Sequence, residues 1–463
     1  MNQLIDFFKN LVHFRKMYTS VWFLFIIPFL GFYGSEKFNG SISDFIIINQ
    51  KYFILEFVFV CVALYVLWWG LQQPPKVKIG KLGIGIAINA ESDEEKRRLK
   101  NDFIAEIKKQ VSLENSQLFQ ILVMPDFFTE KINDRDSAIK YQRMTRSHFF
   151  IYGNWKTRQD EGNEVYVLNL EASVVHSPID LSTSNSFSKE MSAIFPRDVK
   201  IQKELELTEI PLTGDMVSLA AKHCIGIASL ISGNAELAFK LHYGLWKQIG
   251  EISNVKSTFF YCISLMKQNL PKYLFQESTI LSNFYYESSI PNRLEKIKEY
   301  LDVIFLFYPN EYSGLVRQGI YFFEKGEIEE AIKTTKKAVS CSGNRDITAQ
   351  YNFAFLMAFV GRLEEAHKAY KYAFAGTVKD PEFILSIEEF IDNLLQKHPE
   401  KFQFNYCLGM INFFGKEDYQ LAKENFETFI KMAKESKKFN PSVKYAQEYL
   451  KKTNQIIDSR QSV

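Results

Sequence analysis

The stretch GIYFFEKGEIEEA, residues 319–331, returns as AFLMAFVGRLEEA at 354–366, and this pair decides the fold of the second half of the chain. In each stretch a small residue is followed by glycine after seven positions and by alanine after twelve. Apolar residues at helical spacing flank the glycine, which predicts two helices joined by a tight turn. Small residues at matching positions let such helices cross closely.

The same spacing appears in GIASLISGNAELA (226–238) and, with one extra residue, in GMINFFGKEDYQLA (409–422). Four such stretches favour helical repeats over an ordinary α-bundle, and they are similar to the tetratricopeptide repeat (TPR) family, most clearly at 312–345 and 347–380. The resemblance implies a TPR-like α-solenoid over 213–463, with an extra helix near 381–400. It makes the following positions structural: Gly226, Gly233, Ala238, Gly319, Gly326, Ala331, Ala338, Ala354, Gly361, Ala366, Ala373, Gly409 and Ala422. It also implies a concave surface for a protein or peptide partner.

A long apolar segment, YFILEFVFVCVALYVLWWGL at 52–71, lies near the start of the chain. As a helix it would extend about 30 Å, the thickness of the hydrocarbon core of a bilayer. Its one charge is Glu56, which is either a residue near the interface or a pore or oligomer contact. The segment predicts a transmembrane helix.

A shorter apolar segment, YTSVWFLFIIPFLGFY at 18–33, precedes it. We interpret it as a retained first span, with a buried or re-entrant helix and a signal peptide as alternatives. Basic residues before the first span and after the second place both termini in the cytoplasm, which predicts a multi-pass protein of the inner membrane. Residues 2–17 suit a helix lying in the interface. The lipid bilayer is therefore the first predicted partner of domain 1–75.

The region 76–180 predicts a small mixed α/β domain. Short apolar strands alternate with amphipathic helices in the order β-α-β-α-β-β, and the last two strands form a hairpin. The helix after the first strand opens with a capping box, Ser92 and Glu95. The hairpin sequence SHFFIYGNWKTRQDEGNEVYVLNLEASVV (147–175) resembles the amino-terminal α/β domain of the Tol-system propeller protein, which implies assembly or binding. Residues 181–212 are rich in Ser, Thr and Pro and are predicted to be a linker before the repeat domain, 213–463.

Composition and motifs exclude several function classes. The formal net charge of +2 gives no support to nucleic-acid binding. The five cysteines are isolated and the histidines lack metal-ligand spacing, so we expect no metal and no cofactor. Gly83 and Gly85 form an incomplete dinucleotide fingerprint inside a strand and predict close packing. Without a paired nucleophile and base, we expect no enzyme.

Two functions remain. The first is a membrane-anchored scaffold or adaptor that recruits protein partners through its TPR-like repeats. The second is a ligand-triggered membrane effector, as in bacterial defence, in which the α/β domain binds a small molecule at the carboxyl ends of its strands. The spans would then form a homo-oligomer and open the membrane, with Glu56 at the contact.

Overall fold

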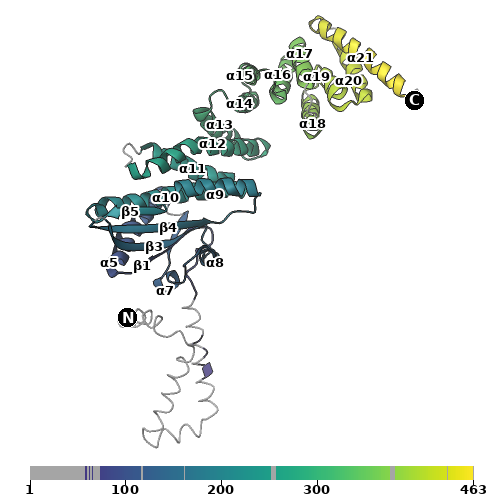
Figure 1. Cartoon of the computed structure of the whole chain (residues 1–463). Helices are drawn as coiled ribbons and strands as arrows, with labels where there is room; N and C mark the ends of the chain where they lie inside the picture. Colours follow the sequence, from purple (N-terminus) through teal and green to yellow (C-terminus); the bar gives the residue numbers. More distant parts are fainter. Residues whose placement is uncertain are drawn as a thin grey trace, which may run out of the picture. The chain divides into compact units, whose positions relative to one another are not determined.

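The computed structural model describes residues 58, 59, 62, 65, 73–115, 118–160, 162–251, 257–375, 381–434 and 436–461 (Figure 1). The two predicted spans, the interfacial helix and Glu56 lie outside the described residues, apart from four single positions of the second span. The chain forms two compact units, Met1–Leu270 and Pro271–Val463. It is mainly helical, with one small mixed sheet in the first unit.

The sheet of the first unit has five strands in the order β2-β1-β3-β4-β5. Its strands are β1 (Leu82–Ala90), β2 (Phe119–Val123), β3 (Phe149–Asp160), β4 (Asn163–Val174) and β5 (Asp198–Gln202). β1 pairs in parallel with β2 and β3, whereas β3, β4 and β5 pair antiparallel. The predicted mixed sheet and its strand order up to the hairpin are therefore present, with one further strand.

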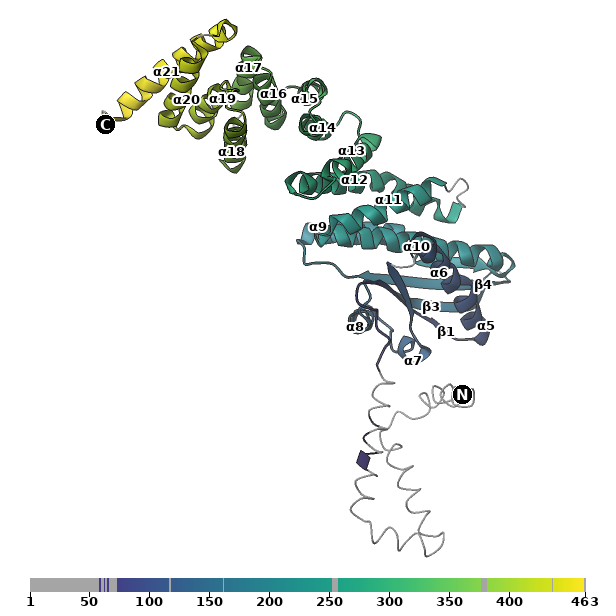
Figure 2. The ribbon, with the colours of Figure 1, turned by 180° about the vertical axis from the view of Figure 1, so that it is seen from behind.

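Helices cover both faces of this sheet. The segment after β1 comprises α5 (Asp93–Arg98), the π-helix η1 (Leu99–Phe103) and α6 (Ile104–Asn115). This segment and α10 (Glu206–Ile231) share the larger core, and Figure 2 shows α6 and α10 on the same face. The opposite face holds a second core under α7 (Asp126–Thr129) and α8 (Arg135–Thr145). The alternating apolar residues of β1 supply both cores, as expected for a strand buried on two sides.

The segment 181–212, predicted to be a linker, is largely ordered structure. It contains α9 (Leu181–Ile194), β5 and the 3₁₀ turn η2 (Lys203–Leu205). Asp180 caps α9 by accepting hydrogen bonds from the backbone N–H groups of Ser182 and Thr183. The sequence did not predict this helix because it is rich in serine and only two of its residues, Phe187 and Ile194, are buried. The linker prediction is wrong for these residues.

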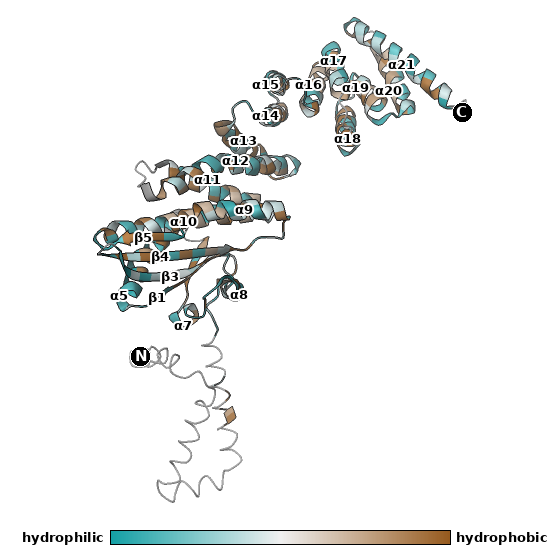
Figure 3. Ribbon diagram, viewed as in Figure 1, coloured by the Kyte–Doolittle hydropathy of each residue, from teal (hydrophilic) through white to brown (hydrophobic). Residues whose placement is uncertain are grey.

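The boundary predicted at residue 213 also differs from the structure. The larger core continues through α10 and α11 (Ala235–Glu251) to Leu270 in α12 (Ser257–Glu287), so α10, α11 and the part of α12 up to Leu270 belong to the first unit. Within the described residues one stretch, Lys203–Ile231, has the length and composition of a membrane span, and 78% of its apolar window is buried. Figure 3 shows α10 in white to brown tones, in contrast to the hydrophilic α5. Helical periodicity alone does not say whether a helix packs on a sheet or on another helix, which explains the error.

The second unit is built of helices that follow one another in antiparallel pairs. After the end of α12 and α13 (Arg293–Phe307), the pairs are α14 (Tyr312–Glu324) with α15 (Ile328–Cys341), and α16 (Ile347–Phe359) with α17 (Leu363–Phe374). The extra helix expected near 381–400 is α18 (Pro381–Lys397). The remaining elements are α19 (Phe404–Met410), the π-helix η3 (Ile411–Lys416), α20 (Tyr419–Ala433), the 3₁₀ turn η4 (Lys437–Phe439) and α21 (Asn440–Gln461).

Candidate functional site

The turn glycines of the repeats adopt the conformation that glycine tolerates best. Gly233, Gly326 and Gly361 have φ values of +81°, +82° and +80°. They lie between α10 and α11, α14 and α15, and α16 and α17 respectively. A side chain at such an angle is strained, so these positions serve the turn.

The other small residues of the repeats lie where paired helices meet. A side chain at Gly226 would meet His242, one at Gly319 would meet Thr335, and one at Gly409 would lie 2.6 Å from the ring of Phe426. The alanines at the repeat positions are all buried: Ala238, Ala331, Ala338, Ala354, Ala366, Ala373 and Ala422. These residues hold helices together and leave none of their side chains for a ligand.

The extra residue of the last repeat is absorbed within a helix. Between Gly409 and Ala422 the helix changes to the π-helix η3, whose longer hydrogen-bonded turn accommodates an inserted residue. Glu417, with φ of 58°, ends this helix in place of a turn glycine. The pairing of Gly409 with Phe426 is therefore kept despite the insertion.

A groove of about 330 Å³ opens on the second unit between α14, α16 and α18. Its walls are mostly apolar and include five aromatic rings. The ring centroids of Phe355 and Phe390 are 5.2 Å apart, and those of Tyr351 and Phe383 are 5.6 Å apart. Phe390 is 47% exposed. The lining includes no charged side chain, and its polar side chains are those of Thr335, Thr348, Tyr351, Asn352 and Ser386. The groove is suited to apolar side chains of a partner.

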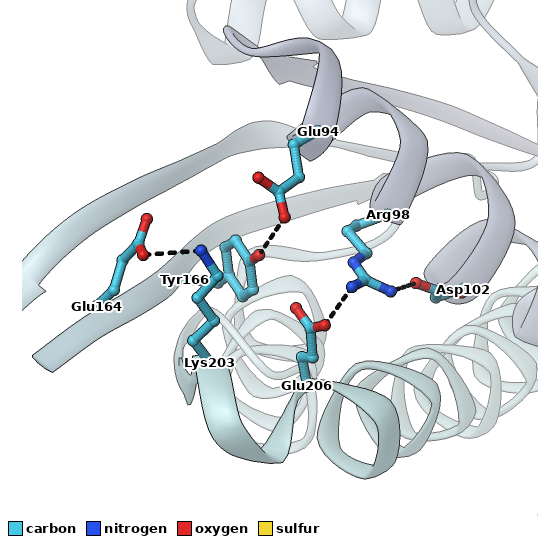
Figure 4. A network of polar contacts seen from close by, with 7 residues as sticks. All are labelled: Glu94, Arg98, Asp102, Glu164, Tyr166, Lys203 and Glu206. Carbon is cyan, nitrogen blue, oxygen red and sulfur yellow. Dashed lines mark hydrogen bonds and ion pairs between the residues drawn. The ribbon is translucent and has the colours of Figure 1, made fainter.

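In the first unit a network of ion pairs and hydrogen bonds joins the helical segment after β1 to β4 and to α10 (Figure 4). The guanidinium of Arg98 pairs with Glu206 at the start of α10 and with Asp102, the latter at 3.3 Å. The hydroxyl of Tyr166 on β4 donates to Glu94 at 3.4 Å. Burial, with the nearby Glu206 carboxylate, raises the pKa of Tyr166 to about 12, so this tyrosine stays a hydrogen-bond donor.

The opening of α5 is held by a buried carboxylate. Glu95 accepts hydrogen bonds from the backbone N–H of Ser92, as the capping box predicted, and from Thr157 on β3. Burial alone would raise the pKa of Glu95, but these hydrogen bonds together lower it. The carboxylate is therefore a fixed anion that joins α5 to β3.

A buried polar cluster lies under α10. Nε2 of His223 lies 2.9 Å from Glu190 on α9, which also accepts from Asn269 at 2.8 Å. Burial lowers the pKa of His223 to about 4, partly offset by Glu190. Among the described residues no group of three His, Cys, Asp or Glu side chains is placed to hold a metal ion. We interpret the cluster as a tie between α9, α10 and α12.

A crevice of about 320 Å³ lies at the carboxyl ends of β1 and β2. Its lining includes Lys96, Lys100 and Lys108, which no sequence motif singled out, although their spacing in multiples of four was a visible signal. Gly83 and Gly85 do not line this crevice; side chains there would meet Val77 and Phe150, as expected for close packing.

No protein-family model matches the chain, and no curated protein matches its sequence. Solved structures that are similar to part of it include "MamA RS-1 ArsTM double mutant" and "MamA 41-end from Desulfovibrio magneticus RS-1". Each is 16% identical, covers 47% of this chain and has a TM-score of 0.27, with 96% and 97% of the respective structure covered.

Proposed function

We propose that this chain is a membrane-anchored scaffold whose second unit recruits a protein partner. The observation that carries the proposal is the uncharged aromatic groove between α14, α16 and α18. Exposed aromatic side chains such as Phe390 are costly in water and are characteristic of binding surfaces. The partner would present an uncharged segment with one or two large apolar side chains.

The membrane placement is part of the same proposal. The apolar segments 18–33 and 52–71 and the basic residues around them support two spans with both termini in the cytoplasm. The groove would then face cytoplasmic proteins. Nothing in this arrangement requires an enzymatic activity or a cofactor.

Site-directed photo-crosslinking of the full-length chain in its native membrane tests the scaffold. A photoreactive residue at Ser386, in the groove, should give a discrete protein adduct that Phe390→Lys abolishes, because the substitution places a charge among the aromatic rings. The matched control is the same photoreactive residue at Glu330, an exposed position on α15 that does not line the groove. Identical adducts from both positions, or none from Ser386, would contradict the proposal.

The crevice at the carboxyl ends of β1 and β2 favours the second candidate, a ligand-triggered membrane effector. In that case ligand binding would promote homo-oligomerisation of the spans, with Glu56 at the contact between copies. Dye release from liposomes containing the full chain should rise when ligand is added and fall in Glu56→Ala. Dye release that does not change when ligand is added, and is the same in Glu56→Ala, would contradict the effector function.

A further inference from the structure

The crevice at the carboxyl ends of β1 and β2 lies where parallel α/β sheets commonly bind ligands. The segment after β1 packs on one face of the sheet, whereas α7 and α8, after β2, pack on the other. The crevice is lined by both helical layers and by the strand ends between them. Ligands of open α/β sheets bind outside the carboxyl ends of the strands, near such a reversal of connections.

Part of the crevice wall is an open strand edge. The last pair between β1 and β2 joins Ile86 to Val123, but β1 continues to Ala90. On its other side β1 stays paired with β3 as far as Ala90. The edge of β1 beyond Ile86 therefore has no strand beside it where Ile88 and Ala90 line the crevice. Backbone N–H and C=O groups on an open edge can hydrogen-bond a polar ring.

The helical wall presents a row of lysines. Lys96, Lys100 and Lys108 line the crevice together with Ile104, so four residues spaced by four face the same way. In a regular α-helix, positions four apart drift by about 40° per step, because one turn takes 3.6 residues. The π-helix η1, in which the N–H of Ile104 bonds to the carbonyl of Leu99, holds more residues per turn and reverses that drift. The π turn thus keeps the lysines in line.

The charged side chains that line the crevice are three lysines and two carboxylates, Asp126 and Glu130, which leaves a net excess of one positive charge. Lys96 lies 3.8 Å from Asp126 across the crevice, an exposed pair that a stronger anion can replace. Lys100, among the described residues, makes no ion pair. The ion pairs of Arg98 and the hydrogen bonds of the buried Glu95 hold the same helical segment in place, so the lysines lie on a rigid element.

The floor of the crevice is apolar. It is formed by side chains of β1, β2 and the helical segment: Ile86, Ile88, Leu99, Ile104, Val123 and Met124. We propose that this crevice binds a nucleotide-class ligand, with its ring against the apolar floor and the edge of β1, and its phosphate at Lys96 and Lys100. A volume of about 320 Å³ is at the lower end of small-ligand sites, which favours a mononucleotide. This inference is independent of the groove on the second unit.

Isothermal titration calorimetry on the full-length chain in detergent tests the inference, with AMP, GMP, CMP, UMP and inorganic phosphate as probes. Lys100→Glu should weaken binding of the monophosphate at least about tenfold by losing a charge-assisted contact. Val123→Trp, at a strand end that is 40% exposed, should fill the apolar part and weaken binding to a similar degree. The matched control is Lys140→Glu on α8, an exposed lysine of the same unit outside the crevice.

The expected result is that at least one monophosphate binds more tightly than phosphate, and that both crevice variants, but not the control, weaken it. Thermal melts of all three variants would verify that each is folded. Absence of heat with all four monophosphates at millimolar concentration would overturn the inference. So would binding that both crevice variants leave unchanged, or phosphate binding as tightly as the monophosphates with no effect of Val123→Trp.

Discussion

The carboxylate of Glu95 accepts two hydrogen bonds from Thr157, one from its backbone N–H at 2.7 Å and one from its hydroxyl at 2.8 Å. These hydrogen bonds join the start of α5, the helix after β1, to β3, which pairs with β1. Since the N–H groups of Glu91 and Ser92 donate to the same side chain, a single buried anion satisfies four donors. The position of the lysine-bearing helical segment depends on it.

Replacing this anion should therefore cost stability. We expect Glu95→Gln to lower the free energy of unfolding by about 2 kcal/mol, because hydrogen bonds to charged groups are lost or weakened. The folded state lowers the pKa of Glu95, so its stabilisation is present above about pH 4.5 and is lost as the pH falls further. Denaturant titration of both proteins at pH 7.5 and pH 3.5 should show the difference shrinking at low pH. A difference independent of pH would contradict this role for the charge.

A methyl group at Gly409 should destabilise the second unit. Alanine is the better helix former by about 1 kcal/mol, but its Cβ would lie 2.6 Å from Phe426, and overpacking costs about 1–3 kcal/mol. We expect Gly409→Ala to lower the melting temperature. The control is Gly250→Ala in α11, where a Cβ meets nothing within 4 Å and the melting temperature should rise. Stabilisation by both substitutions would show that the helices do not cross closely at Gly409.

The pair Asp215 and Glu106 should make the stability of the first unit depend on pH. Burial beside Glu106 raises the pKa of Asp215 to about 6, so the folded state retains a proton that the unfolded state has lost between about pH 4 and pH 6. Stability therefore falls as the pH rises through this range. Asp215→Asn should remove the penalty and stabilise the protein at pH 7.5 by about 1 kcal/mol, with little effect at pH 4.

Thermal unfolding at both pH values checks this expectation. Asp302→Asn on α13 is the matched control, because Asp302 forms an exposed pair with Lys298 and its loss should change the free energy by less than about 0.5 kcal/mol. An equal gain from Asp215→Asn at both pH values would mean that packing, and not the proton that Asp215 retains in the folded state, accounts for the effect.

The position of the domain boundary can be tested by two fragments. A fragment of residues 271–463 contains the whole second unit and should be monodisperse with a cooperative thermal transition. A fragment of residues 213–463 adds most of α10 without the sheet that covers it, so it should expose apolar surface and aggregate. Size-exclusion chromatography distinguishes the two. A soluble, monomeric 213–463 fragment would instead support the domain boundary at residue 213 that the sequence predicted.

The helical pairs were predictable because their turns depend on single residues. Gly326 and Gly361 must adopt a positive φ, and the spacing from each to the next alanine follows from helix geometry. β1 and β2 were predictable because they are short apolar runs between Pro74 and Pro125. β3 and β4 were predictable because apolar and polar residues alternate in both, on either side of a polar turn.

The remaining features depend on contacts between distant segments. Whether α10 packs on a sheet or on another repeat is decided by β1, β3 and β4, more than 30 residues away in the sequence. The crevice depends on β1 continuing to Ala90 after β2 has ended at Val123, and on the π turn at Leu99, which has no sequence pattern that we recognise. The hydrogen bond from Thr157 to Glu95 joins residues 62 positions apart.

The core of the first unit, which includes both Leu82 and Leu270, has a consequence for the emerging chain. At a synthesis rate of about 5–20 residues per second, β1 would leave the ribosome about 10–40 s before the end of this core. During that interval the apolar face of β1 and β3 would lack α10, and exposed strands are prone to aggregate. We therefore expect the nascent chain to depend on chaperones until α12 has been synthesised.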